Sequence, residues 1–257
     1  MVELVDSHCH LNDEKFEEDL SAAVDRAKSA GVTRIINFGD RMATSSRVVD
    51  LAHEFDGLFA GVGIHPEEVY EMQKKDDDRI IQFAEDSKVV AIGEIGLDYY
   101  WEKDSDRRAL QRQIFIHQLD LARQLHLPVC IHDRDAHGDT LEILKKEAIG
   151  IRGVLHCFSG SLEMAREVWK LGFLIGVDGP LTFKNAAKLP EVVREVPREL
   201  LLIETDSPYM APVPNRGKRN EPAYVKFVAE KVAEIRGETF EEVAEYTTRN
   251  AVNLYSI

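Results

Sequence analysis

Short segments rich in Val, Ile and Leu alternate along the chain with longer segments of helical hydrophobic period. Several of the short segments are nearly continuous in apolar residues, a pattern typical of strands that are buried on both faces. The predicted strands lie at residues 2–7, 33–38, 58–64, 88–95, 128–131, 153–158, 173–177 and 200–204. The predicted helical segments lie at residues 14–29, 41–54, 106–126, 136–147, 161–171 and 222–235.

Strands that alternate with helices predict a parallel sheet, and eight of them in 257 residues predict a closed (β/α)8 barrel of the TIM type. The main alternative is an open, doubly wound sheet, which shows the same alternation. The link at 178–199 is less regular, because Pro180, Pro190 and Pro197 interrupt it. The chain contains no low-complexity linker and no internal repeat, so we expect a single domain over residues 1–257.

Two histidines follow the first predicted strand. Side chains at positions i and i+2 of a strand share one face, so His8 and His10 should project together from its C-terminal end. Two neighbouring imidazoles make half of a metal site. Taken alone, they could equally be ordinary polar residues where a strand meets a loop.

The other predicted strands also end in polar residues, and in a barrel of this type the C-terminal strand ends carry the chemistry. A lone histidine after a strand is more often a hydrogen-bonded structural residue than a metal ligand. A selective concentration of histidines at strand ends is not expected of independent structural residues, so it favours a metal site. Asp13 and Asp135 precede helices and suit helix capping instead. The side chains expected to converge on one rim are His8, His10, Glu94, His132, His156 and Asp206.

Six such side chains exceed what one tetrahedral ion with an open position needs. Two ions about 3.5–4 Å apart, bridged by a carboxylate, would use all six. The expected ligands are His8, His10 and Asp206 for one ion, His132 and His156 for the other, and Glu94 for both. Imidazole-rich ligation suits Zn, Mn, Fe or Ni better than Mg, and the sequence does not choose among these five metals.

Composition and charge limit the setting and the substrate. The chain is 44% hydrophobic and 30% charged, as in globular proteins, and it contains neither a run of about 18 apolar residues nor a recognisable signal peptide. Cys9, Cys130 and Cys157 lie in no CxxC motif, so we expect a reduced, cytoplasmic protein. A net charge of −14 argues against non-specific binding to nucleic acid, so an anionic substrate would be captured locally by metal ions or a small basic patch.

Six motifs in order, spread between residue 6 and about residue 225, resemble the TatD family. They are His-Cys-His (8–10), Gly-Ile-His-Pro (63–66), Gly-Glu-Ile-Gly-Leu-Asp-Tyr-Tyr (93–100), Ile-His-Asp-Arg-Asp-Ala (131–136), His-Cys-Phe-Ser-Gly (156–160) and Glu-Thr-Asp-Ser-Pro-Tyr (204–209). The resemblance implies a metal-dependent hydrolase of the amidohydrolase-like barrel group, and it places metal ligands at the same six positions. Asp133 departs from the family pattern, since many relatives carry a small residue such as Ser there.

The resemblance also implies the activity of a deoxyribonuclease. The expected enzyme is an exonuclease that hydrolyses single-stranded or frayed DNA through water activated by two metals, with no membrane partner and no obligate protein partner. DNA as the substrate and the preference for ends come from the resemblance alone. The alternatives are a hydrolase of cyclic amides or esters and a non-catalytic barrel scaffold. Glu94 stands where many amide hydrolases use a carbamylated lysine, and the scaffold would be expected to lose ligands.

Several side chains receive candidate roles in that reaction. Asp206 is the candidate to orient water and accept its proton, with a plain ligand role as the alternative, and Glu94 joins it in the catalytic set. Arg134 follows His132 by two residues, and its guanidinium would hold a phosphate. The other expected substrate contacts are His65, which would touch substrate or support the ligands; Tyr99, which with Tyr100 and Trp101 would stack on a base or fill the loop core; and Arg216 and Arg219 in the basic segment 211–220.

Overall fold

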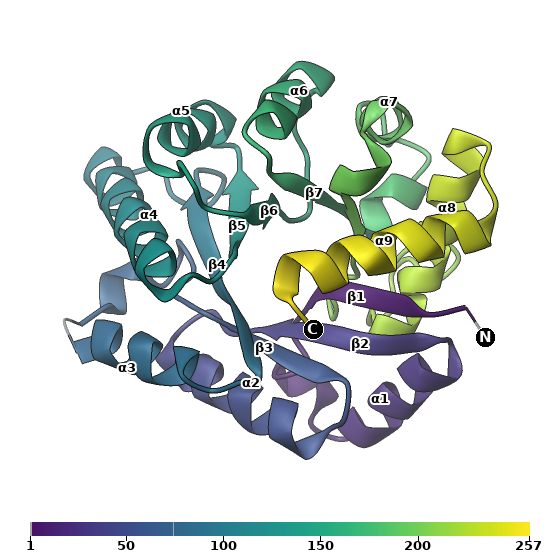
Figure 1. Ribbon diagram of the computed structural model, residues 1–257, viewed down its shortest axis with the longest axis horizontal. Coiled ribbons are helices and arrows are strands. Elements are labelled where there is room, and N and C mark those ends of the chain that lie inside the picture. Colours follow the sequence, from purple (N-terminus) through teal and green to yellow (C-terminus); the bar gives the residue numbers. More distant parts are fainter. Residues whose placement is uncertain (1, 74) are drawn as a thin grey trace.

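The computed structural model describes residues 2–73 and 75–257. Its eight strands form one sheet in chain order, and every neighbouring pair is parallel. A further parallel bridge joins Cys9 to Ser207, so the sheet curls round and closes (Figure 1). The strands are β1 (Leu4–Cys9), β2 (Val32–Phe38), β3 (Leu58–Val62), β4 (Val89–Asp98), β5 (Val129–Arg134), β6 (Gly153–Leu155), β7 (Leu174–Val177) and β8 (Leu201–Ile203). The predicted (β/α)8 barrel is confirmed, and the doubly wound alternative is excluded because its strand order would reverse.

Helices surround the barrel in Figure 1, and none of those in the described part of the chain is long and apolar enough to cross a bilayer. The α-helices are α1 (Leu20–Ser29), α2 (Met42–Glu54), α3 (Lys75–Ala84), α4 (Ser105–Leu125), α5 (His137–Glu147), α6 (Leu162–Lys170), α7 (Leu189–Glu195), α8 (Val225–Arg236) and α9 (Phe240–Tyr255). The short 3₁₀ turns are η1 (Glu14–Phe16), η2 (Val69–Glu71), η3 (Gly179–Thr182), η4 (Arg198–Leu200) and η5 (Pro222–Tyr224).

Helices α3, α7 and α9 have no counterpart in the predicted pattern. Helix α3 opens on an acidic first turn, so its apolar period is short. Helix α7 spans only seven residues, with a proline in its first turn. Helix α8 ends at Arg236 and is followed by Gly237, whose φ of 66° is the left-handed conformation that glycine adopts freely. Helix α9 starts three residues after Gly237, behind a capping box formed by Thr239 and Glu242.

The two aspartates expected to cap helices behave differently. Asp13 accepts a hydrogen bond from the backbone N–H of Lys15 and caps η1, as expected. The expectation for Asp135 is wrong, since α5 begins behind Ala136 and no side chain caps it. Asp135 instead adopts a φ of 56° in the tight turn between β5 and α5.

Two strands that carry expected ligands have irregular pairing. The register between β1 and β2 shifts between Asp6 and Cys9, and the register between β4 and β5 shifts between Ile92 and Ile95. Such irregularities redirect the side chains within them. Strand β1 runs to Cys9, two residues beyond its predicted end, and therefore includes His8.

Successive strand residues alternate between two apolar layers, as they must in a barrel. Leu4 and Ile35 pack outward against the helices, whereas their neighbours Val5 and Ile36 point into the barrel. The interior also receives residues from α9. The inner layer comprises Val5, Ile36, Phe38, Val90, Ala91, Cys130, Val154, Leu174, Leu202, Ala251, Leu254 and Tyr255.

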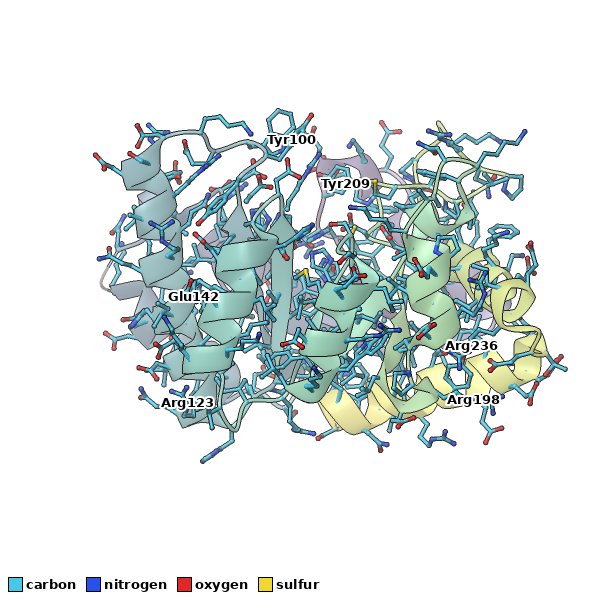
Figure 2. The ribbon with its side chains drawn as sticks, turned by 90° about the horizontal axis from the view of Figure 1, so that it is seen from above. Tyr100, Arg123, Glu142, Arg198, Tyr209 and Arg236 are labelled. Atoms are coloured by element: carbon cyan, nitrogen blue, oxygen red, sulfur yellow. The ribbon has the colours of Figure 1, made fainter. Side chains whose placement is uncertain are left out.

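Helix α9 therefore closes one end of the barrel. Figure 2 shows α9 at the opposite end of the molecule from Tyr100 and Tyr209, which follow β4 and β8. The C-terminal strand ends, where the candidate chemistry lies, are thus separated from α9 by the packed interior.

Shortening a buried α9 side chain should destabilise the whole barrel. Leu254 is 4% exposed, so Leu254→Ala should lower the free energy of unfolding by about 2–5 kcal/mol through lost contacts and a cavity. Urea unfolding followed by far-UV circular dichroism measures this loss. Asn253→Ala, at an exposed position of the same helix, is the control. An equal, small effect of both changes would show that α9 contributes little to the interior.

Candidate metal centre

The six expected ligands lie together at the C-terminal end of the barrel. His8, Glu94 and His132 belong to β1, β4 and β5, while the other three lie one to three residues beyond strand ends. His8 and Glu94 are 0% and 3% exposed, so the cluster is deeply set. The remaining members are His10, His156 and Asp206.

Glu94 lies between two pairs of histidines. Its Oε2 is 3.4 Å from Nε2 of His8 and 3.5 Å from Nε2 of His10. Its Oε1 is 2.7 Å from both Nδ1 of His132 and Nε2 of His156. One carboxylate oxygen therefore faces each half of the ligand set, which is the geometry required of a bridge.

Asp206 completes the first half of the cluster. Its Oδ1 lies 3.8 Å from Nε2 of His8 and 3.5 Å from Nε2 of His10. The backbone N–H of Asp206 donates to the carbonyl oxygen of His8 at 3.0 Å, next to the bridge between Cys9 and Ser207. The closing of the barrel thus brings residues nearly 200 positions apart into one site.

The atoms in this cluster fit a cation. Nδ1 of His10 donates to the carbonyl oxygen of Phe38 at 3.0 Å, which leaves Nε2 as the lone-pair atom of the neutral ring. That atom lies 3.1 Å from Nε2 of His8 and faces the oxygens of Glu94 and Asp206. Lone pairs that meet in this way require protons or a metal between them, and nitrogen and carboxylate donors suit a divalent transition metal.

The charges respond strongly to one another. Burial raises the pKa of Glu94, but the surrounding histidines, His156 foremost, lower it by more than burial raises it. The pKa of Glu94 therefore lies well below the usual range. Burial lowers the pKa of His10, but the hydrogen bond to Asp206 and the charge of Glu94 raise it to about 9. Burial also lowers the pKa of His132, but its hydrogen bonds to Asp98 and Glu94 raise that pKa to about 9. Without metal, therefore, protons occupy part of the site.

Two buried carboxylates behind the ligands were not singled out from the sequence. Oδ2 of Asp98 lies 3.0 Å from Nε2 of His132, and Oε1 of Glu204 lies 3.6 Å from Nδ1 of His156. Both lie at the same strand ends as the candidate ligands, and this position is the feature of the sequence that could have identified them. Gly176 leaves room for Glu204, because a Cβ there would lie 2.3 Å from its Oε2. Such partners orient a metal-binding imidazole and fix its tautomer.

His65 also belongs to the cluster. Its Nε2 is 3.5 Å from Oε1 of Glu94, and its ring centroid is 4.5 Å from that of His132. It therefore lies on the side of the second histidine pair, where it can contact either the ligands or a bound substrate.

A cavity of about 1120 Å³ opens above the cluster. Arg134, the candidate phosphate ligand, lines the cavity, and its guanidinium lies 4.0 Å from the ring centroid of Tyr100 and 5.7 Å from that of Trp101. Trp101 and Tyr209 also line the cavity. Carboxylates outnumber lysines and arginines in the lining, where the only Lys and Arg side chains among the described residues are Arg41, Arg134 and Lys188.

Three of the residues expected to contact substrate lie away from this cavity. The hydroxyl of Tyr99 donates to Asp139 at 2.6 Å, in the layer between α4 and α5. Arg219 pairs with Asp19 at 2.9 Å, so the basic segment is partly neutralised from within. Arg216 is exposed, and its guanidinium lies 4.3 Å from the ring centroid of Phe183. None of the three lines the cavity.

A family model described as TatD related DNase matches residues 5–256. The chain belongs to the TatD family. It is 46% identical over 255 residues to the uncharacterized metal-dependent hydrolase YabD of Bacillus subtilis strain 168, covering 99% of each chain. It is 42% identical over 259 residues to the uncharacterized metal-dependent hydrolase YcfH of Escherichia coli K12, covering 99% of this chain and 96% of that one. The crystal structure of YjjV, a TatD homolog from E. coli K12, superposes with a TM-score of 0.93 at 33% identity and covers 100% and 99% of the two chains.

The partner of His132 should control metal affinity in this TatD family member. Asp98→Asn keeps the shape and the acceptor for the backbone N–H of Trp101 but removes the charge behind the imidazole. We expect metal to bind about 10–100-fold more weakly, measured by competition with a chromophoric chelator. Asp139→Asn, outside the cavity, is the matched control and should leave the affinity unchanged. Equal affinities in the two variants would contradict the role of Asp98.

Metal binding should release protons. His10 and His132 have pKa values of about 9 without metal, so both hold protons near neutral pH, whereas a metal binds the neutral imidazole. Apparent metal affinity should therefore rise with pH and level off above about pH 9. Calorimetry in two buffers of different ionisation enthalpy measures the protons released at neutral pH. Identical heats in the two buffers would contradict this prediction.

Proposed function

We propose that this chain is a metal-dependent hydrolase that cleaves phosphodiester bonds and removes nucleotides from single-stranded or frayed DNA ends. The observation that carries the proposal is the position of Glu94, whose two oxygens face two separate histidine pairs at 2.7–3.5 Å. That arrangement suits two cations with one bridging carboxylate. The family description as DNase and the names of the relatives as metal-dependent hydrolases support the reaction class.

Six ligands are assigned to the two ions. His8, His10 and Asp206 would hold one, His132 and His156 the other, and Glu94 both. When bound, the two ions would supply Lewis acidity that acidifies a water and neutralises the charge of the phosphate.

Asp206 is the proposed proton acceptor. Burial raises its pKa, but the hydrogen bond and charge of His10 lower it below its usual value, so the carboxylate is ionised. Asp206 also lines the cavity, where it can orient a water toward the substrate. Hydrolysis forms a P–O bond from that water and breaks the P–O bond between the phosphate and the leaving sugar oxygen of the neighbouring nucleotide. The proton taken by Asp206 is available to the leaving oxygen.

Arg134 is the proposed phosphate ligand. It has no carboxylate within ion-pair distance among the residues that the structure describes, and aromatic rings hold it in place at the cavity wall. A guanidinium kept in this way retains its donors for a phosphate oxygen pair.

Labelled single-stranded DNA with Mn, Mg, Co or Zn tests the proposal. We expect metal-dependent release of mononucleotides that disappears with chelator and falls by about a hundredfold or more in Glu94→Gln, because the bridge is lost. Arg134→Ala should raise KM about tenfold with metal content unchanged. Turnover of a lactone or dihydropyrimidine without DNA cleavage by any of the four metals would contradict the proposal, and loss of metal in Arg134→Ala would contradict the assignment of Arg134.

A further inference from the structure

The charged side chains around the cavity are divided by position. The segments that follow β1, β2 and β3 contribute six carboxylates and one guanidinium, whereas the end of β5 and the segments that follow β4 and β7 contribute a guanidinium, an indole and an ammonium group. Because the strands are arranged in chain order round the barrel, these two groups of loops face each other across the mouth.

The acidic side carries exposed charges without ion-pair partners. Glu14, Glu17 and Glu67 line the cavity, are exposed, and form no ion pair within the described residues. Arg41, the one cation there, is shared between Asp40 at 3.3 Å and Glu68 at 3.5 Å. We call Glu14, Glu17 and Glu67 the acidic wall.

The opposite side is suited to an anion. Arg134 and Lys188 line it without ion-pair partners among the described residues, and the indole of Trp101 is 62% exposed beside them. Two carboxylates on this side are less available. Asp133 pairs with His137 at 2.8 Å, and Asp178 is 1% exposed against the thiol of Cys157 at 3.3 Å.

We propose that this division makes the site specific for strand ends. Resting on the proposed function, the inference is that the nucleic acid strand enters over Arg134, Lys188 and Trp101, with a phosphodiester above Glu94. The acidic wall repels any further phosphate beyond the scissile one, because the repulsion between like charges lowers the binding affinity several-fold or more. A strand can then occupy one side only, and the site accepts a terminal nucleotide but not the middle of a chain.

Circular single-stranded DNA tests the acidic wall, because it has no end. The triple variant Glu14→Gln, Glu17→Gln, Glu67→Gln should cleave a circle at least about tenfold faster than the natural chain, with bound metal unchanged. The matched control is Asp50→Asn, Glu230→Gln, Glu241→Gln, which changes the net charge equally at exposed positions outside the cavity. Circular dichroism verifies that both variants fold, and metal analysis verifies that both bind metal.

A second variant tests the entry side independently. Lys188→Ala should raise KM for linear single-stranded DNA several-fold at constant kcat, and the dependence of KM on salt should become shallower. This measurement remains informative if the triple variant does not fold.

The outcomes separate the inference from the proposed function. Cleavage of circles by the triple variant alone supports the inference. The inference would be overturned if circles stayed intact in the triple variant or if the control variant gained as much activity on circles. It would also be overturned if the natural chain cleaved circles as fast as linear DNA, or if Lys188→Ala left KM unchanged. None of these results would contradict the nuclease activity itself. Failure of the natural chain to cleave linear DNA with any metal would overturn the proposed function itself.

Discussion

An ionised carboxylate buried among imidazoles is the interaction on which the site depends. Glu94 is 3% exposed, and a buried charge is tolerated only where opposite charge or strong donors surround it. Its partners come from β1, β5 and β6 or their ends, so these strands must hold their register for the charge to be compensated. Protons on these histidines or a bound cation can each supply the opposite charge that Glu94 requires.

The closing of the barrel supplies the rest of the site. Asp6 of β1 accepts hydrogen bonds from the backbone N–H and the hydroxyl of Thr205, at 2.8 and 2.6 Å. The backbone N–H of His10 donates to the carbonyl oxygen of Ser207 at 2.7 Å. These contacts fix the segment after β8 against β1. A weakened closure would therefore displace Asp206 from the histidines as well as loosen the fold.

The barrel and the convergence of the six candidate ligands could be predicted from the sequence because both follow from local rules. Strands show as apolar runs, and residues at strand ends converge in any parallel barrel, which brings His8 and Asp206 together. Side-chain contacts between residues far apart in the sequence could not be predicted. Arg219 looked available to substrate, yet Asp19, 200 positions away, neutralises it. The roles of Asp98 and Glu204 also depend on side-chain distances that spacing does not reveal.

Helix α9 has a consequence for the order of folding during synthesis. Ala251, Leu254 and Tyr255 fill the interior that the strands alone leave open. Although domains begin to fold from the N-terminus as the chain leaves the ribosome, this barrel cannot complete its core until those residues have emerged. Until then the nascent chain presents an open apolar interior, so the period between synthesis of β8 and emergence of α9 is the one in which chaperones have most to bind.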